Sequence, residues 1–446
     1  MKRRLWLLFA VITAISFMTI SVISCDDPPP PASVEFEITS PYAEVNWGTF
    51  GQFKAAQHVH TTNSDGSGTM EQVANAHYQL NYDILAITDH VWKGESPRQY
   101  LNLVTRVPTQ ETWPNFNSSL SPVPLTFINA ARLAEFETGT ATSSTRPANR
   151  PMLMIRGSAE FAFPDGEEMN VFFLPDNVTP PNAWDVSIAD GIQRVQNAGA
   201  ICFINHPGRT TNAQNFRVAN SKDRVPGTAG VLPPNDPANP SNMFSWIMKY
   251  ANLYMQFPAT TLTGMEVFNR RDVDSLHDRV LWDNVNTFTI PEGRYVWGYG
   301  NDDLHSYAIS TSGGNGLQIN YNMFVMPENT PENFRTAMVK GHSYIVTVCA
   351  FNEGIDMPAA NAGSERPIIT SVTTGENTIT ITAQNATSID WISEGRKIHT
   401  TTITDGSGTI TLNDPAIVNQ VGAFVRANII GPSGMAVIQP IGTKRK

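Results

Sequence analysis

The stretch HVHTTNSDG at residues 58–66 decides how the fold is interpreted, because it ends a strand-like run in side chains that bind metals. Residues two apart on a strand point to the same side, so His58 and His60 can hold one ion together. Asp303 and His305 repeat this spacing after another strand-like run. The remaining ligand-type residues also follow predicted strands, and they are Asp65, His90, Glu160 and His206. One such pair is weak evidence, but two pairs with four further ligands predict a metal centre.

Strand-like and helix-like segments alternate between the two pairs. The predicted strands are 52–59, 82–88, 152–155, 200–205, 265–268 and 295–299, and the predicted helices are 69–80, 188–198 and 274–284. Ionisable residues follow the strands, and in parallel α/β folds the active site lies at the carboxyl ends of the strands. This pattern predicts an α/β sheet or barrel. Residues 102–150 and 210–240 lack periodicity and are rich in polar residues and proline, so we expect loop insertions there.

The first 25 residues have the pattern of a bacterial lipoprotein signal peptide. A basic start is followed by an apolar run that ends in VISC at residues 22–25. Lipidation of Cys25 would make it the mature N-terminus and anchor the protein in the cell envelope, outside the cytoplasm, facing the periplasm or the surface. Residues 26–33 are proline-rich and predict a stiff tether. An uncleaved transmembrane anchor is the alternative interpretation.

The composition changes near Glu365, and a chain of 446 residues suggests two domains. Residues 366–446 are rich in Thr, Ile and Val and alternate as in TITIT at 378–382, which predicts an antiparallel, β-sandwich-like domain. No ligand or nucleophile cluster falls in that region of the sequence. We therefore expect residues 34–365 to form the metal-binding domain and to fold and work without the rest.

The bulk composition excludes some classes of protein. With 41% hydrophobic and 16% charged residues the chain can bury a core. The net charge of −10 argues against a general nucleic-acid binder, and no basic patch is evident. Cys202 and Cys349 lie in apolar strand-like runs. They are interpreted as buried free thiols in preference to a disulfide.

These motifs together resemble the PHP (polymerase and histidinol phosphatase) superfamily of metal-dependent phosphoesterases. The resemblance covers roughly residues 58–305. It rests on six short stretches, which are HVHTTNSDG at 58–66, AITDH at 86–90, GSAE at 157–160, INHPG at 204–208, MEVFN at 265–269 and NDDLH at 301–305. The resemblance implies a distorted seven-stranded (β/α) barrel, and the β-sandwich-like domain predicted from composition would follow it.

The resemblance also implies two or three divalent metal ions, with Zn, Mn and Fe left open. The implied ligands are His58, His60, Glu160 and Asp303 for the first ion, Glu160 and His206 for the second, and Asp65, His90 and His305 for the third. The chain departs from the family pattern at residues 168–170, where Glu168 stands in place of a frequent histidine. Whether Glu168 is an oxygen ligand or an ordinary loop carboxylate is left open.

The implied reaction is hydrolysis of a phosphate ester on a small or exposed phosphorylated substrate. Clustered metals lower the pKa of a bound water, so that hydroxide is available at neutral pH. Glu160 and Asp303 would serve catalysis as ligands, and Arg209 could clamp a substrate phosphate. Other cations near the motifs could do the same, and they are Lys93, Arg270 and Arg271. Asp302 or Asp89 could carry protons or orient a ligand histidine.

Two other interpretations remain open at this point. The same metals could hydrolyse an amide, an ester or a sugar-linked bond, since a metal-activated water is not specific for phosphate. Alternatively, the protein could be a surface-anchored binding protein whose metals are structural. The long ligand set argues against the last, because structural sites are usually closed cages of four ligands.

Overall fold

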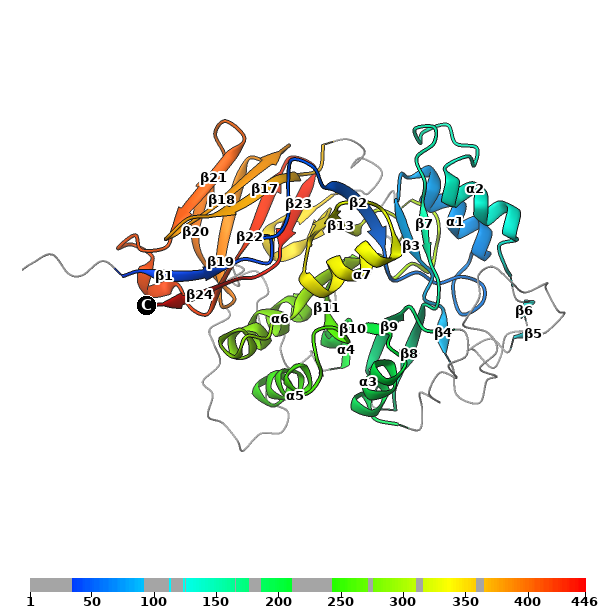
Figure 1. Ribbon diagram of the computed structural model, residues 1–446, viewed down its shortest axis with the longest axis horizontal. Coiled ribbons are helices and arrows are strands. Elements are labelled where there is room, and N and C mark those ends of the chain that lie inside the picture. Colours follow the sequence, from blue (N-terminus) through cyan, green and yellow to red (C-terminus); the bar gives the residue numbers. More distant parts are fainter. Residues whose placement is uncertain are drawn as a thin grey trace, which may run out of the picture. The chain divides into compact units, whose positions relative to one another are not determined.

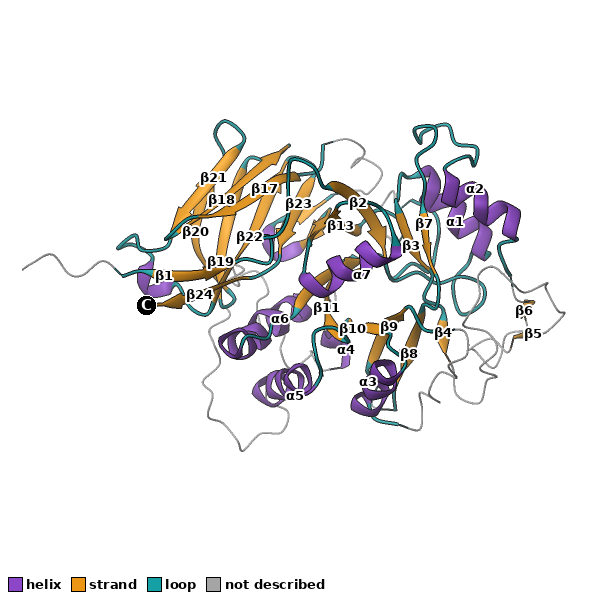
Figure 2. Cartoon of the chain, in the orientation of Figure 1, coloured by secondary structure: helices purple, strands orange, loops and turns teal. Residues whose placement is uncertain are grey.

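The computed structural model describes residues 34–91, 112–113, 123–124, 126–164, 166–175, 186–210, 243–271, 276–309, 316–357 and 365–446. The predicted signal peptide, Cys25, the tether, Lys93 and most of the predicted insertion at 210–240 lie outside them. Residues 35–446 form one compact unit of mixed α/β structure. Strands are more numerous than helices in the described part (Figure 2). The predicted mixed α/β class is therefore confirmed.

The largest sheet has eleven strands and contains the strand that leads to the first histidine pair. Nine of its strands run in the order β1 (Phe36–Thr39), β24 (Ile441–Arg445), β22 (Phe424–Gly431), β23 (Gly434–Ile438), β14 (Ser343–Thr347), β13 (Asn320–Met326), β2 (Gly51–Ala56), β3 (Ile84–Ala86) and β7 (Leu153–Ile155). The other two form a branch, in which β19 (Ser388–Ser393) pairs with both β22 and β20 (Arg396–Thr402). Strands β2, β3 and β7 are parallel, whereas β13 pairs with β2 in the antiparallel sense.

A second sheet of six strands carries or precedes most of the other candidate ligands. Its order is β12 (Trp297–Asn301), β11 (Leu262–Asn269), β10 (Ile201–Asn205), β9 (Glu168–Phe172), β8 (Ala159–Ala162) and β4 (His90–Val91). Strands β10, β11 and β12 are parallel, but β8, β9 and β10 are antiparallel. The parallel strands are thus divided between two sheets, and a closed seven-stranded (β/α) barrel is not shown. That finer architecture stays a prediction.

Three smaller sheets complete the described strands. They are β17 (Ile368–Thr374), β18 (Thr378–Gln384) and β21 (Ser407–Thr411), then β15 (Cys349–Ala350) with β16 (Ile355–Asp356), and β5 (Thr112–Trp113) with β6 (Val123–Pro124). All pairs within them are antiparallel. In β18, Ile379 and Ile381 are fully buried while Thr378, Thr380 and Thr382 are partly exposed, as the alternation predicts.

The helices form where the sequence supplies caps and an apolar face. Helix α1 (Met70–Gln79) begins with a capping box, because Thr69 accepts from the Gln72 backbone and Gln72 accepts from the Thr69 backbone. The other helices are α2 (Ala130–Thr138), α3 (Ile188–Asn197), α4 (Pro207–Thr210), α5 (Met243–Gln256), α6 (Leu276–Thr289) and α7 (Pro331–Lys340). Helix α2 lies inside the predicted loop insertion at 102–150. The prediction missed it because only two of its side chains, Leu133 and Phe136, are buried.

The core packing decides which side of strand β11 faces the candidate site. Met265 and Val267 join the apolar cluster that includes Trp282 from helix α6. Helix α6 lies beside β11 (Figure 1). Glu266, between the two apolar residues, therefore points to the opposite face of the strand. A buried carboxylate is thus directed away from the apolar cluster, into the region of the ligand strands.

Cys202 and Cys349 are buried, and neither forms a disulfide within the described part of the chain, as predicted. No helix in the described part of the chain is long and apolar enough to cross a membrane.

The region after Glu365 shares a sheet with the region before it. Strand β23 pairs with β14, so that Tyr344 lies opposite Ile438. Arg426 in β22 forms a buried bidentate ion pair with Asp283 in α6, with both N–O distances at 2.7 Å. Strand pairing and buried charge thus continue across the predicted boundary, which argues against independent folding of residues 34–365.

The ion pair between Arg426 and Asp283 gives the first prediction. Replacing Arg426 with alanine should lower the free energy of unfolding by about 3–5 kcal/mol, since it leaves Asp283 as an uncompensated buried charge. Both side chains are at most 4% exposed, so solvent cannot screen the loss. Denaturant unfolding of the two proteins measures this. A loss of about 1 kcal/mol or less, the value of a surface pair, would contradict it.

Candidate metal centre

Two ligand-bearing segments run side by side where strands β2 and β12 end. His60 donates its backbone N–H to the Leu304 carbonyl at 2.9 Å, and Leu304 donates its own to the His58 carbonyl at 3.2 Å. Val59 and Leu304 thus form a parallel bridge. Because alternate side chains share a side, this bridge directs His58 and His60 toward Asp303. The two predicted pairs therefore meet in space.

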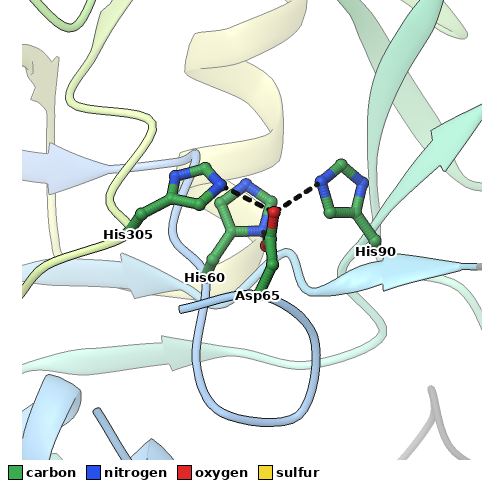
Figure 3. A group of neighbouring side chains, drawn as sticks. All are labelled: His60, Asp65, His90 and His305. Carbon is green, nitrogen blue, oxygen red and sulfur yellow. Dashed lines mark hydrogen bonds and ion pairs between the residues drawn. The ribbon is translucent and has the colours of Figure 1, made fainter. Parts of the chain in front are cut away.

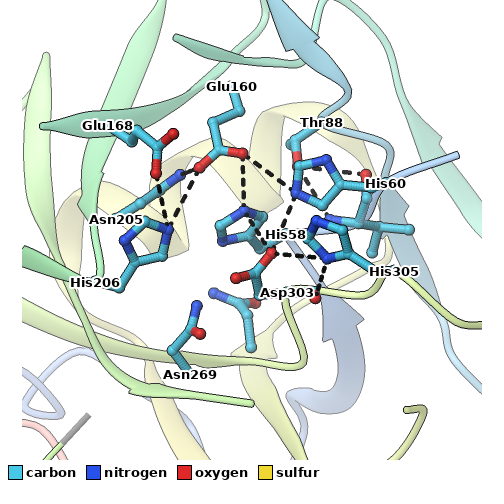
Figure 4. Close-up of polar contacts among 12 residues, drawn as sticks. His58, His60, Thr88, Glu160, Glu168, Asn205, His206, Asn269, Asp303 and His305 are labelled. Carbon is cyan, nitrogen blue, oxygen red and sulfur yellow. Dashed lines mark hydrogen bonds and ion pairs between the residues drawn. The ribbon is translucent and has the colours of Figure 1, made fainter. Parts of the chain in front are cut away.

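The innermost group consists of His58, His60, Glu160 and Asp303 (Figure 4). Glu160 Oε2 lies 3.1 Å from His58 Nε2 and 3.2 Å from His60 Nε2. Asp303 Oδ1 lies 3.3 Å and 3.2 Å from the same two nitrogens. All four side chains are at most 2% exposed. These are the four residues that the sequence resemblance assigns to the first metal.

Three ligand-type atoms of this group converge without hydrogen-bond partners. They are His58 Nε2, His60 Nε2 and Glu160 Oε2, all buried and all unpartnered among the described residues. Buried polar atoms are almost always satisfied, and exceptions mark functional sites. His58, His60 and Asp303 also each offer a ligand atom within 4.8 Å of the others. The arrangement therefore fits a divalent metal ion, which would accept all these lone pairs at once.

A second group lies on the other side of Glu160 and includes Glu168. His206 Nε2 lies 3.3 Å from Glu168 Oε2 and 3.6 Å from Glu160 Oε1. His90 Nδ1 lies 3.2 Å from Glu160 Oε2 and 4.0 Å from Glu168 Oε1. The structure thus places Glu168 among the candidate ligands. Glu160 stands between this group and the innermost one, as the predicted bridging role requires.

A third group surrounds Asp65 nearer to solvent (Figure 3). Asp65 Oδ2 lies 3.0 Å from His305 Nε2 and 3.8 Å from His90 Nε2. Asp65 Oδ1 lies 3.4 Å from His60 Nδ1. The predicted third set was Asp65, His90 and His305. The structure adds His60 to it, and it places His90 between this group and the second one.

Asp89 orients the loop that carries part of the site. It accepts hydrogen bonds from the Thr61 backbone at 2.6 Å and from Ser64 Oγ at 2.7 Å. Because Ser64 donates to Asp89, its oxygen is left to accept from His60 Nδ1, 3.3 Å away. That leaves His60 Nε2 with a lone pair for a metal. Of the two roles predicted for Asp89, these contacts favour the orienting one.

Asp302, which directly follows strand β12, contacts the backbone of a neighbouring segment. It accepts backbone hydrogen bonds from Gln318, Ile319 and Asn320 at 2.8–3.0 Å. Burial raises the pKa of Asp302 to about 7, against the opposing effect of these bonds. Its carboxylate therefore holds the segment at residues 318–320 in place.

The charges of the innermost group depend strongly on one another. Burial by itself lowers the pKa of His60, but its contacts with Asp303 and Glu160 raise it to about 10. Burial favours the neutral forms of both carboxyls, yet His58 beside them holds the pKa of Glu160 and of Asp303 well below the usual range. In the metal-free molecule, protons on the histidines balance the carboxylates.

Metal binding should therefore release protons. At pH 7 a metal ion must displace the proton that His60 holds with a pKa of about 10 in the metal-free molecule. The apparent metal affinity should rise as the pH rises from 6 toward 9, the range in which that proton is progressively easier to lose. Calorimetric titration in two buffers of different ionisation enthalpy measures the release. An affinity independent of pH over this range would contradict the prediction.

One of the cations predicted to clamp substrate lies at the site. Arg270 Nε is 3.0 Å from Asp303 Oδ2, and its guanidinium lies 3.0 Å from His305 Nδ1. Arg271 instead pairs with Asp356 and lies away from the ligands. The backbone of Arg209 belongs to helix α4, but its side chain is outside the described part of the chain. Its predicted clamping role stays a prediction.

Sequence reasoning gave no role to Glu266 or Asn205, although both contact candidate ligands. Glu266 Oε1 lies 2.8 Å from His58 Nδ1. Asn205 donates to Glu160 Oε1 at 2.5 Å and to Asn170 Oδ1 at 3.0 Å. A charged residue inside an apolar strand was the available signal for Glu266.

No protein-family model matches this chain, and no curated protein matches its sequence. It is similar to the structure of a two-domain protein from Bacteroides vulgatus ATCC 8482 that contains a predicted PHP-like metal-dependent phosphoesterase. That likeness has 15% identity and a TM-score of 0.41, and it covers 92% of this chain and 90% of the other.

A second similar structure is the lesion-specific endonuclease PfuEndoQ from Pyrococcus furiosus, with 9% identity and a TM-score of 0.33. That likeness covers 65% of this chain and 56% of the endonuclease, so this chain spans little more than half of the endonuclease's length.

Proposed function

We propose that this protein is a metal-dependent hydrolase that cleaves phosphate esters. The observation that carries the proposal is the convergence of His58 Nε2, His60 Nε2 and Glu160 Oε2, which are buried and without hydrogen-bond partners in the described structure. Bound divalent ions would supply an activated water at neutral pH and would neutralise charge on the phosphoryl group. Two or three ions of Zn, Mn or Fe would satisfy the three groups of ligands.

The chain's own residues would divide the work by their position. His58 and His60 would hold the innermost ion together with Asp303. Glu160 faces the innermost group with Oε2 and His206 with Oε1, so the one carboxylate would serve both groups of ligands. Buried ligands of this kind place the reacting groups with little freedom to move, which favours a defined geometry for attack.

The exposed fractions of the ligands indicate where a substrate would enter. The side chains of Asp65 and His305 are 29% and 27% exposed, whereas His58 and His60 are fully buried. Arg270 is 30% exposed and lies against the same edge. A phosphate that approached from this edge would meet the guanidinium charge, which favours a phosphorylated substrate over a neutral amide or ester.

An activity screen tests the reaction class. The protein is stripped of metal, reloaded separately with Mn, Zn or Fe, and offered a generic phosphomonoester, a phosphodiester and an acyl ester. We expect hydrolysis of at least one phosphate ester that requires metal and is lost in a Glu160→Gln variant. Metal-dependent cleavage of the acyl ester alone would instead support the amide or ester hydrolase.

We also propose that the enzyme works outside the cytoplasm on a lipid anchor at Cys25. The support is the sequence of residues 1–25, with its basic start, apolar run and terminal VISC. The proline-rich residues 26–33 would separate the enzyme from the membrane surface.

Processing at Cys25 can be checked directly. Mass spectrometry of the protein from its native membrane fraction should find a mature N-terminus at Cys25 that carries lipid. A Cys25→Ser variant should release the protein from that fraction. An unmodified peptide that runs through Cys25 would contradict the proposal.

A further inference from the structure

Glu266 is a fully buried carboxylate that has four hydrogen-bond partners. Its Oε1 lies 2.8 Å from His58 Nδ1 and accepts from Asn301 Nδ2 at 2.9 Å. Its Oε2 accepts from the His206 backbone N–H at 3.1 Å and from Asn269 Nδ2 at 3.0 Å. Among these donors are two candidate ligands from different strands. Both oxygens of Glu266 are engaged by these donors, so Glu266 is not counted among the candidate ligands.

The local backbone is shaped to make this arrangement possible. The pairing of β11 with β12 shifts register between Glu266 and Phe268, which is a β-bulge at Val267. On a regular strand, residues three apart point to opposite sides. The bulge inserts one residue and so lets Asn269 reach the same side as Glu266 and donate to it. Bulges often redirect side chains next to active sites.

The contact with His58 determines which ring nitrogen is available to a metal. A neutral imidazole carries one N–H group. When that group is at Nδ1, it donates a hydrogen bond to the carboxylate of Glu266. The lone pair is then on Nε2, the buried atom that lies near both Glu160 and Asp303. Without Glu266 the proton could move to Nε2 and occupy the position that a metal needs.

The contact with His206 holds a backbone that is otherwise unfavourable. His206 has a φ of +22°, which lies in the region that L-residues rarely adopt. Its N–H points to Glu266, so the hydrogen bond helps to keep His206 in this conformation at the end of β10. One carboxylate thus fixes a ligand from each of two groups.

We infer that Glu266 is a positioning residue that sets the tautomer of His58 and the backbone of His206 for metal binding. The inference rests on the proposed metal-dependent function and names a residue outside the predicted ligand set. His60 Nδ1 instead faces the Ser64 hydroxyl at 3.3 Å and Asp65 Oδ1 at 3.4 Å. The contact of Glu266 with His58 should fix the tautomer of that ring firmly, since charge-assisted hydrogen bonds are the stronger kind.

A Glu266→Gln variant tests the inference because it keeps size but removes one acceptor. Whichever way the amide is turned, its NH2 faces a pair of donors, either His58 with Asn301 or Asn269 with the His206 backbone. We expect the affinity for Zn or Mn, measured by competitive chelator titration, to fall about 10- to 100-fold. Glu266→Asp should recover part of this loss, because it keeps the charge on a shorter side chain.

An Asp283→Asn variant is the matched control. Asp283 is also a buried carboxylate, but it pairs with Arg426 instead of a candidate ligand. It should cost stability while leaving metal affinity within about 2-fold of the original, since it touches no ligand. An equal loss of affinity in both variants would mean that general destabilisation explains the effect, and the inference would be wrong.

A spectroscopic measurement on the unaltered protein covers the case in which Glu266→Gln fails to fold. Long-range 15N–1H spectra of the Zn-loaded protein should show His58 with its proton on Nδ1, strongly downfield as expected for a bond to carboxylate. A His58 signal with the proton on Nε2, or with no carboxylate shift, overturns the inference. If the unaltered protein binds no metal at all, the proposed function falls as well. Normal metal binding with equal affinity in Glu266→Gln removes only the role of Glu266.

Discussion

Replacing His58 or Asp303 with alanine is expected to abolish hydrolysis and to lower the bound metal in parallel. Each residue offers a buried ligand atom to the innermost group, so its loss removes the activated water and the charge stabilisation together. The rate constant kcat should fall by at least about a thousandfold, the scale on which transition-state charge stabilisation acts. Steady-state kinetics and elemental analysis of the same samples measure both quantities.

An Arg209→Ala variant is the contrasting case. A guanidinium cannot bind a cation, so we expect full metal content and a raised KM with kcat nearly unchanged. Arg270→Gln should raise KM as well, but it should also change the metal affinity, because Arg270 contacts Asp303 and His305. Normal kcat and full metal occupancy in the His58 variant would remove the proposed mechanism.

A chain that ends at Glu365 is expected to lose its cooperative fold. Truncation exposes the whole edge of β14 that pairs with β23, and it leaves Asp283 without Arg426. Buried unpaired charge and an open apolar edge each destabilise a domain by several kcal/mol, on the order of its entire stability. Residues 34–446 serve as the control. Thermal unfolding of the two chains compares their cooperativity, and metal titration compares their metal affinity.

If the shorter chain keeps its fold, the prediction from sequence that residues 34–365 fold alone would hold. If residues 34–365 unfold cooperatively and bind metal as tightly as residues 34–446, the shared sheet contributes little. Adding residues 366–446 as a separate chain offers a further check, because we expect it to restore part of the lost stability.

The ligand residues could be predicted from sequence because they belong to short, local patterns. His58 and His60 are separated by one residue, and so are Asp303 and His305, so the period of a strand alone places each pair on one side. His206 also directly follows an apolar run that forms a strand, β10. Local periodicity therefore predicted which side chains share a side of a strand, whereas their grouping into metal sites was implied by the family resemblance.

The features that were missed depend on contacts between distant parts of the chain. Glu266 gains its role from His58, which lies 208 residues away in the sequence. The shared sheet depends on β14 pairing with β23 across nearly a hundred positions. The antiparallel β8–β9 hairpin was also missed, because its strands are buried on both sides and show no alternation. Register and pairing partner follow from packing, which no local pattern contains.

The most direct test of the central claim is a crystal of the protein loaded with Mn or Zn, with anomalous diffraction recorded at the metal edge. We predict a strong anomalous peak within bonding distance, about 2.0–2.2 Å, of His58 Nε2, His60 Nε2 and Asp303, and at least one more that shares Glu160. If His58, His60 and Glu160 keep their positions in such a crystal and no anomalous peak lies among them, the protein is not the metal-dependent hydrolase proposed.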